Sequence, residues 1–201
     1  MALADCGVAI LAGGRATRMG GVAKGLIERD GRTILDAALD VLRPLFGEIL
    51  LVANDADPYR RFGLPIVGDV HKGCGPLGGL HAALLAMRPA RVFLCACDMP
   101  ALRAEAVRLV AEADPEADVV VPVVGGRPEP LHARYSKRCL PAIERALGDQ
   151  RYKMAGFFSE VRVLEIPEAD LRRIDPELSF LRNVNTPEDL RTLTERREAG
   201  P

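Results

Sequence analysis

The sequence predicts an α/β fold with a mostly parallel sheet that is covered by helices on both faces. The first observation is that short apolar runs of strand length alternate with longer amphipathic runs of helical spacing, the order that βαβ units produce. The second is that 48% of the residues are hydrophobic and 27% are charged, as in an ordinary globular protein. The third is the length of 201 residues, for which one domain is the natural expectation.

The expected elements follow from periodicity and from the residues that start or stop them. Residues 7–11 form a short apolar run that ends at a glycine pair, which predicts a buried first strand. Residues 33–45 carry apolar side chains at helical spacing, and the helix expected at 76–87 opens with a proline, a residue favoured in the first turn. The other elements expected before residue 125 are strands at 48–52, 65–67, 92–97 and 118–124 and a helix at 103–113.

The pattern is less regular after Gly125. We expect a strand at 131–135, a helix at 137–147 and a strand at 161–166. A final helix is expected from Thr186, because a threonine suits the N-cap and the proline that follows it suits the first helical position. The second half is therefore expected to depart from strict alternation of strands and helices.

Charge and cysteine content argue against several classes of protein. The net charge is −1 and the pI about 6.3, which disfavours a nucleic-acid or anionic-membrane surface because such surfaces need a basic patch. With no N-terminal signal and no apolar run of spanning length, we expect a cytoplasmic protein without a membrane partner.

The cysteine spacing fits neither a disulfide framework nor a zinc site, so free buried thiols are expected at Cys6, Cys74, Cys95, Cys97 and Cys139. The histidines lie in no metal-ligand spacing and are expected to be surface or hydrogen-bonded side chains: His71, His81 and His132.

Residues 11–24 hold four glycines and three cations directly after the first expected strand. Ligands of open α/β sheets bind outside the carboxyl ends of the strands, so this loop lies where a ligand is expected. Gly13 and Gly14 allow backbone N–H groups to approach phosphate oxygens, and Arg18 and Lys24 supply positive charge. The loop lacks the Gly-Lys-Ser/Thr of a Walker A motif, and it therefore predicts a phosphate site of another class.

A second glycine-rich segment imitates a dinucleotide site. Residues 73–78 match Gly-x-Gly-x-x-Gly, and Asp98 follows about 20 residues later, as the dinucleotide fingerprint requires. The residues before this segment are polar, however, and it does not lie in the first strand–helix connection. A nicotinamide- or flavin-dependent oxidoreductase is therefore kept only as a rival interpretation.

Polar residues at two other places complete the candidate site. Asp98 ends the apolar run 92–97 and is expected at the same edge of the sheet as the glycine-rich loop. A carboxylate there can hold Mg²⁺ against substrate phosphates, the alternative being a turn aspartate before Pro100. Asn183 and Asn185 share one face of an extended segment and can orient a phosphate, a metal or an acceptor, the alternative being a structural turn.

Taken in order, these motifs resemble the molybdenum cofactor guanylyltransferase family. The shared motifs are Leu-Ala-Gly-Gly with the following Arg-Met-Gly and Lys24, Gly75-Pro76-Leu77-x-Gly79, Cys97-Asp98-Met99-Pro100 and Asn183-Val184-Asn185-Thr186-Pro187. They extend from Val8 to the final helix, and the complete set is more specific than the first loop alone. The resemblance implies a fold of nucleotidyltransferase type, a single Rossmann-like three-layer domain with a mixed sheet. Residues 1–201 would form that domain, with a nucleotide-binding half at 1–124 and an acceptor-binding half at 125–201.

The resemblance also implies a reaction. GMP would pass from GTP to the phosphate of molybdenum-loaded molybdopterin, giving the guanine dinucleotide form of the cofactor and pyrophosphate, with Mg²⁺ as the cofactor. The acceptor is a phosphate monoester whose second pKa is about 6, so it is largely dianionic at neutral pH and needs no general base. Molybdoenzymes or their chaperones are the protein partners that such a product implies.

Residue roles follow from the same resemblance. Lys24 would act in catalysis on the phosphates, and Asp98 would do so by binding Mg²⁺ beside GTP. Arg18 joins them as a catalytic candidate because its charge would offset the repulsion between the two anionic substrates. The nucleotide contacts would be Leu11, Ala12, Gly13, Gly14, Lys24, Asp69 and Asp98, and the acceptor contacts Asn183 and Asn185. Family members often carry Asn-Ala-Asn after the second strand, where this chain has Val52-Ala53-Asn54, so only Asn54 is left there as a candidate nucleotide contact.

Other functions remain open beside this one. Within the same class, the chain could be a cytidylyltransferase acting on the same pterin or a sugar-phosphate nucleotidyltransferase; Gly13 favours guanine, because cytidylyltransferase relatives usually carry alanine there. Outside it, the chain could be a non-catalytic module that binds GTP and the pterin and delivers the cofactor. The pairing of Lys24 with Asp98 favours chemistry, since a pure carrier needs no metal ligand.

Overall fold

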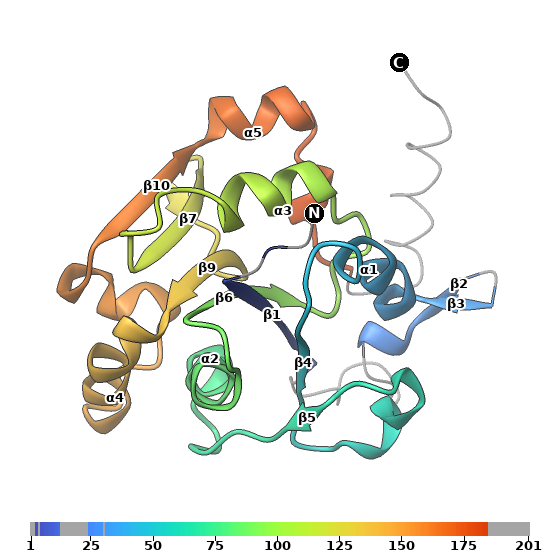
Figure 1. Cartoon of the computed structure of the whole chain (residues 1–201), viewed down its shortest axis with the longest axis horizontal. Coiled ribbons are helices and arrows are strands. Elements are labelled where there is room, and N and C mark those ends of the chain that lie inside the picture. The colour runs from blue at the N-terminus through green and yellow to red at the C-terminus, as the bar shows by residue number, and fades with distance from the viewer. Residues whose placement is uncertain (1–2, 4, 13–23, 30, 185–201) are drawn as a thin grey trace.

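The computed structural model describes residues 3, 5–12, 24–29 and 31–184 (Figure 1). Within them, one sheet has eight strands: β1 (Cys6–Leu11), β4 (Ile49–Val52), β5 (Ile66–Val67), β6 (Arg91–Ala96), β7 (Val119–Val124), β8 (Arg127–Pro128), β9 (His132–Ser136) and β10 (Val163–Pro167). A separate hairpin pairs β2 (Glu28–Arg29) with β3 (Arg32–Thr33).

The strand order is β10-β7-β9-β6-β1-β4-β5, with β8 paired to β7. The strands β6, β1, β4 and β5 run parallel, as does the β7–β10 pair, whereas β9 runs antiparallel to both of its neighbours. The prediction of a mostly parallel, mixed sheet is therefore confirmed.

Helices form the two outer layers. They are α1 (Ile34–Leu42), α2 (Gly75–Ala86), α3 (Ala104–Ala111), α4 (Leu140–Gly148) and α5 (Glu168–Ile174), with 3-10 turns η2 (Lys24–Leu26), η3 (Asp57–Phe62), η4 (Lys137–Cys139), η5 (Met154–Glu160) and η6 (Ser179–Leu181). Apolar side chains of α1, α3 and α5 form one core cluster and those of α2 and α4 form another. In Figure 1, α3 and α5 lie above the sheet and α2 and α4 below it, so the sheet is covered on both faces.

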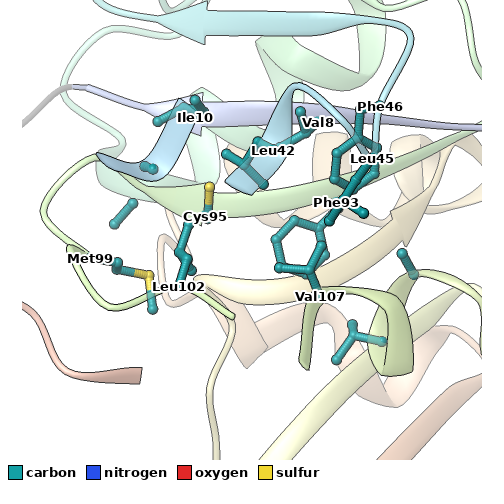
Figure 2. Packing of buried hydrophobic residues seen from close by; sticks show 14 of the residues in the cluster. Val8, Ile10, Leu42, Leu45, Phe46, Phe93, Cys95, Met99, Leu102 and Val107 are labelled. Atoms are coloured by element: carbon teal, nitrogen blue, oxygen red, sulfur yellow. The ribbon is translucent and has the colours of Figure 1, made fainter. Parts of the chain in front are cut away.

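The central strand β1 is buried on both faces. Val8 and Ile10 belong to the cluster on the α1 and α3 side, whereas Ala9 and Leu11 belong to the cluster on the α2 side. Figure 2 shows the first of these clusters; in the register of β1 with β6, Val8 is paired with Phe93 and Ile10 with Cys95. Such two-sided burial is typical of parallel strands and explains why the first strand reads as a continuous apolar run.

Local sequence explains where α1 begins and ends. The Thr33 hydroxyl accepts a hydrogen bond from the Asp36 N–H at 3.1 Å, and the Asp36 carboxylate accepts one from the Thr33 N–H at 2.9 Å. This capping box satisfies two N–H groups that lack helical partners. The helix ends at Leu42, shortly before Pro44, rather than at residue 45 as predicted. Arg43 still has helical dihedral angles and donates to the Leu39 carbonyl, but Pro44 has no N–H with which to continue the helical hydrogen bonds.

Beyond residue 125, the structure differs from the predicted elements in detail. The helix expected at 137–147 is divided into η4 and α4, with Pro141 in the first turn of α4. The elements α5, β8 and the β2–β3 hairpin were not predicted. Strands β9 and β10 belong to the same sheet as β1, so the second half of the chain adds strands to the sheet that the first half begins. The helix predicted from Thr186 lies outside the described residues.

The buried polar side chains test two predictions. All five cysteines are free and buried, as predicted. The prediction for the histidines was wrong at two positions: His81 and His132 are buried, and their ring nitrogens make no hydrogen bond of normal geometry to any residue that the structure describes. His132 instead packs between Phe93 and Phe180, with ring centroids 5.0 and 5.3 Å away. Because β9 sits between β6 and β7, its residues become buried although their local sequence is polar.

Candidate functional site

The carboxyl ends of four neighbouring parallel strands define one rim of the sheet. Ala12 follows β1, Asn54 follows β4, Asp69 follows β5 and Asp98 follows β6. Ligands of open α/β sheets bind at this rim. The structure therefore brings most of the described candidate residues to the edge where the sequence predicted them.

Lys24 and Asp98 meet at the end of β6. The Lys24 ammonium lies 3.4 Å from Asp98 Oδ2, and Asp98 is only 8% exposed. The second oxygen, Oδ1, is buried and has no hydrogen-bond partner among the described residues. Burial raises the pKa of Asp98 above its usual value, while the charge and hydrogen bond of Lys24 act in the opposite direction.

Lys24 is held at this place by a close approach of backbone. Gly25 follows it in η2, and a Cβ added to Gly25 would lie 2.9 Å from Cys97 Cβ and 3.2 Å from the Cys97 carbonyl oxygen. A larger residue would push η2 away from the end of β6. Glycine at position 25 therefore allows Lys24 to reach Asp98, a role that the sequence pattern did not show.

The carboxyl-terminal segment is tied to the same aspartate. The Val184 N–H donates a hydrogen bond to the Asp98 carbonyl oxygen at 2.8 Å, and its side chain is buried against Ile27 and Ile34. Asn183, the neighbouring residue, is exposed beside this anchor. The structure thus ties the backbone that follows Asn183 to the backbone of Asp98, although the two lie far apart in the sequence.

Leu11 and Ala12 lead into the glycine-rich loop and are held from three sides. The Leu11 carbonyl accepts a hydrogen bond from the Cys97 N–H at 3.0 Å, and the Ala12 N–H donates to the Val52 carbonyl at 2.9 Å. The buried Tyr59 hydroxyl donates to the Ala12 carbonyl at 3.0 Å. Tyr59 was missed by sequence reasoning, because an isolated tyrosine in an irregular segment carries no pattern.

Asn54 and Asp69 form a reciprocal pair beside Ala12. The Asp69 N–H donates to Asn54 Oδ1 at 2.9 Å, and Asn54 Nδ2 donates to Asp69 Oδ2 at 2.8 Å. Both residues retain solvent exposure. The side-chain amide of Asn54 is thus engaged with Asp69, whereas the sequence reasoning treated it as a candidate nucleotide contact of its own.

Several predicted site residues cannot be placed. Gly13, Gly14, Arg18 and Asn185 lie outside the described residues. Their assignments stay predictions.

The glycines at 73–79 have conformational and packing roles in this structure. The preceding strand β5 ends at Val67, so no strand leads directly into the segment. A Cβ on Gly78 would lie 2.9 Å from the His71 carbonyl oxygen, and one on Gly79 would lie 2.9 Å from Leu11 Cδ2. Close packing of α2 on its neighbours accounts for Gly78 and Gly79, whereas Gly73 and Gly75 have positive φ angles of 81° and 62°, which favour glycine.

Two further observations concern metals and membranes. The described residues contain no cluster of three or more His, Cys, Asp or Glu side chains placed to bind a metal. At this rim, the buried Asp98 carboxylate has one oxygen without a described partner, and carboxylate oxygens are ligands that divalent cations take. Nor does the described part of the chain include a helix with the length and hydrophobicity needed to cross a bilayer.

Comparison with known proteins adds a family to this geometry. Residues 8–162 match the family described as MobA-like NTP transferase domain. A probable molybdenum cofactor guanylyltransferase from Pelotomaculum thermopropionicum is 40% identical over 182 residues, which cover 90% of this chain and 88% of that protein. The chain belongs to the molybdenum cofactor guanylyltransferase family. It is therefore a nucleotidyltransferase, as the sequence predicted.

One more relative and two solved structures are similar to this chain over most of its length. A molybdenum cofactor guanylyltransferase from Desulfosudis oleivorans is 36% identical over 182 residues, 90% of each chain. The solved molybdopterin-guanine dinucleotide biosynthesis protein A from Archaeoglobus fulgidus has a TM-score of 0.79 at 28% identity and covers 96% of this chain and 98% of its own. A nucleotidyl transferase from Methanothermobacter thermautotroptrophicus shares the fold at 16% identity, with a TM-score of 0.70.

Proposed function

We propose that this enzyme transfers GMP from GTP to the phosphate of molybdenum-loaded molybdopterin. The products are molybdopterin guanine dinucleotide and pyrophosphate, and the reaction depends on Mg²⁺. Support comes from the names of the relatives, which specify the molybdenum cofactor and a guanylyl group. The observation that carries the proposal is the buried Asp98 carboxylate, with Lys24 against one oxygen and no described partner for the other.

Asp98 fits the chemistry of a magnesium ligand. Mg²⁺ is commonly held by one or two carboxylates together with substrate phosphates and water, and Oδ1 of Asp98 offers the unpartnered acceptor that such a site needs. When bound there, Mg²⁺ would neutralise the charge that builds on the departing pyrophosphate. The remaining residues would bind, orient and counter the charge of the two substrates.

The triphosphate would lie along the rim from β6 to β1. Lys24 and Arg18 would neutralise its charge, while Leu11, Ala12, Gly13 and Gly14 would present backbone and apolar contacts to the nucleotide. Asp69 would contact the nucleoside end. Residues 1–124 would thereby form the nucleotide-binding half.

The acceptor would approach from the side of the carboxyl-terminal segment. Asn183 and Asn185 would orient its phosphate, and residues 125–201 would form the acceptor-binding half. An oxygen of this dianionic phosphate would attack the α-phosphorus of GTP in line with the bond to the β-phosphate, which breaks as pyrophosphate leaves. The acceptor carries no proton that must be removed first, which agrees with a site that contains a cation and a carboxylate rather than a histidine base.

Pyrophosphate release tests this proposal. The intact enzyme is given Mg²⁺ and molybdate-loaded molybdopterin, and GTP, CTP, ATP and UTP are compared in parallel. Release with GTP alone, dependent on the pterin, is the expected result. Release with CTP instead would overturn the guanylyl assignment, and absence of release with all four nucleotides and an acceptor of proven activity would overturn the reaction.

A further inference from the structure

A small apolar cluster lies apart from the two cores that cover the sheet. It consists of Ile27, Ile34 and Val184, which are 7%, 2% and 0% exposed. These side chains come from the segment after η2, the first residue of α1 and the carboxyl-terminal end of the described chain. The cluster is therefore a local contact that joins segments distant in sequence, rather than a part of either main core.

Ile27 is connected to Lys24 through the backbone. The Ile27 N–H donates to the Lys24 carbonyl at 3.2 Å, and the Ile27 carbonyl accepts the Ile34 N–H at 3.1 Å. The residues between the two isoleucines form the β2–β3 hairpin, in which Glu28 is paired with Thr33. Ile27 therefore has a fixed place between the turn that carries Lys24 and the start of α1.

Val184 is connected to Asp98 in a similar way. Its N–H donates to the Asp98 carbonyl at 2.8 Å, and its side chain is fully buried, whereas the preceding residue, Asn183, is exposed. One hydrogen bond alone leaves a segment free to turn about that bond. The buried side chain of Val184 is a second contact, and it fixes the backbone from which Asn183 projects.

The cluster thus joins three groups that the proposed reaction uses. Lys24 is attached to it through the backbone of Ile27, and Asp98 through the backbone of Val184. Asn183 is attached because it directly precedes Val184. A change in the packing of Ile27 against Val184 would therefore move the segment of Asn183 relative to Lys24 and Asp98. A shift of about 1 Å between reacting groups can lower a rate roughly a hundredfold, even when the altered residue lies away from the chemistry.

We propose that Val184 is a positioning residue, whose contact with Ile27 holds Asn183 at the acceptor side of the Lys24–Asp98 pair. The side chains of the cluster are hydrocarbons, so they act on orientation and not on charge. This inference rests on the proposed function, because Asn183 meets the acceptor only in that reaction. It predicts that the packing of the cluster controls use of the acceptor and leaves binding of the nucleotide unchanged.

Pyrophosphate release at increasing concentrations of molybdenum-loaded molybdopterin, with saturating GTP and Mg²⁺, measures the KM for the acceptor. Val184→Ala is expected to raise this KM about tenfold, because the shortened side chain leaves a gap against Ile27 and the segment of Asn183 shifts. Titration of the same variant with GTP and Mg²⁺ in the absence of acceptor is expected to give an unchanged Kd. The reason is that the backbone hydrogen bonds from Lys24 to Ile27 and from Ile27 to Ile34 remain.

A compensating pair of substitutions tests the direct contact. Ile27→Val removes one methylene from the cluster and Val184→Ile adds one, so the double variant keeps the total volume. Each single variant is expected to raise the KM for the acceptor, and the double variant is expected to restore it, because volume-conserving changes in a packed cluster are tolerated best.

Val107→Ala is the matched control, since Val107 is as fully buried as Val184 but belongs to the core under α3. This variant is expected to lower the free energy of unfolding and to keep the KM for the acceptor. An equal rise of that KM in Val107→Ala and Val184→Ala would overturn the inference, because the effect would then follow from lost stability alone.

The remaining outcomes separate this inference from the proposed function. An unchanged KM for the acceptor in Val184→Ala, with acceptor-dependent pyrophosphate release intact, would overturn the inference alone. A raised Kd for GTP in place of a raised KM for the acceptor would also overturn it, because Val184 would then serve the nucleotide. Absence of acceptor-dependent release in the unaltered enzyme would overturn the proposed function and the inference with it.

Discussion

Two buried charges in neighbouring strands of the sheet have opposite surroundings. Arg134 in β9 is fully buried, and its guanidinium donates to the backbone carbonyls of Ala111, Ala113, Asp114 and Ala117, at distances between 2.6 and 3.3 Å. Asp98, at the end of β6, has Lys24 near one oxygen and no described partner on the other. The two terminal nitrogens of Arg134 are thus bonded to the end of α3 and the loop after it, and only its Nε lacks a described partner, whereas one of the two carboxylate oxygens of Asp98 is an unused acceptor.

The difference separates a structural charge from a functional one. Burial opposes both charges, since it raises the pKa of Asp98 and lowers the pKa of Arg134. Carbonyl groups at the carboxyl end of α3 compensate the arginine, because they are the groups left without helical partners. Asp98 lacks equivalent compensation and lies at the rim, which is the arrangement expected of a group that awaits a cation.

The largest expected effect follows from removing the unused acceptor. Asp98→Ala is expected to lower kcat/KM for nucleotidyl transfer about a thousandfold, roughly 4 kcal/mol of transition-state stabilisation. The free energy of unfolding is expected to stay equal or to rise above the unaltered value, because the raised pKa means that the ionised carboxylate weakens the fold. Steady-state kinetics and urea unfolding at neutral pH measure the two quantities.

The pH dependence of unfolding sharpens this first test. A carboxyl group whose pKa is raised in the fold favours the folded state below its unfolded pKa, and this contribution is lost as the pH rises through the folded pKa. Asp98→Ala should therefore gain stability relative to the unaltered protein as the pH rises above the ordinary range of aspartate. Full activity in a folded Asp98→Ala variant would show that the carboxylate has no part in the reaction.

The second expected effect falls on stability alone. Arg134→Leu leaves the buried carbonyls of Ala111 and Ala113 without this donor, and we expect a loss of about 3 kcal/mol in the free energy of unfolding. GTP binding at the remaining folded protein should be unchanged, since Arg134 lies away from the rim residues. An Arg134 variant that is stable but binds GTP poorly would contradict the conclusion that Arg134 has a structural role and Asp98 a functional one.

A third effect concerns His132, which lies on the same face of β9 as Arg134. Burial lowers the pKa of His132 to about 3, against a smaller opposing effect of the Ala106 backbone. In the unfolded chain this imidazole takes up a proton near pH 6.5, whereas in the folded chain it stays neutral down to a much lower pH. The free energy of unfolding therefore falls as the pH decreases from about 6.5 toward 3. At pH 5 the loss is about 2 kcal/mol.

A leucine at position 132 isolates this contribution. His132→Leu keeps the apolar contacts with Phe93 and Phe180 but cannot take up a proton. Its free energy of unfolding is expected to fall less steeply than that of the unaltered protein between pH 7 and pH 5. If the free energies of unfolding of the two proteins change equally with pH, His132 is not a buried neutral imidazole in the folded state.

The fold could be predicted where the pattern of residues within one segment determines its secondary structure. The apolar run of β1 and the helical spacing of the apolar residues in α1 are both local, so the first strand and the first helix were found within a few residues. The β2–β3 hairpin was missed because two-residue strands have no periodicity. The burial of His132 and Arg134 was missed because it depends on β6 and β7, which pair with β9 from distant parts of the chain.

The same distinction applies to the candidate site. Lys24 and Asp98 were predicted from the loop and the strand end, and the structure brings them to 3.4 Å. The reciprocal bonding of Asn54 and Asp69 was not predicted, since it arises from the register of β4 and β5. Chemistry-bearing residues were recognisable by type and spacing, whereas the groups that position them act through the tertiary structure.

The smallest expected effect tests one such positioning contact. Tyr59→Phe removes the hydroxyl that donates to the Ala12 carbonyl at 3.0 Å and keeps the buried ring. Loss of one hydrogen bond at the entry to the glycine-rich loop is expected to raise the KM for GTP about fivefold, with kcat nearly unchanged. Tyr135→Phe is the matched control, because its hydroxyl donates to the Pro130 carbonyl at 2.8 Å across β6 from β1. If both variants lose about 1 kcal/mol of stability but only Tyr59→Phe raises the KM for GTP, the hydroxyl orients the nucleotide loop. An equal KM for GTP in the two variants would show that the Tyr59 hydroxyl, like Arg134, only stabilises the fold.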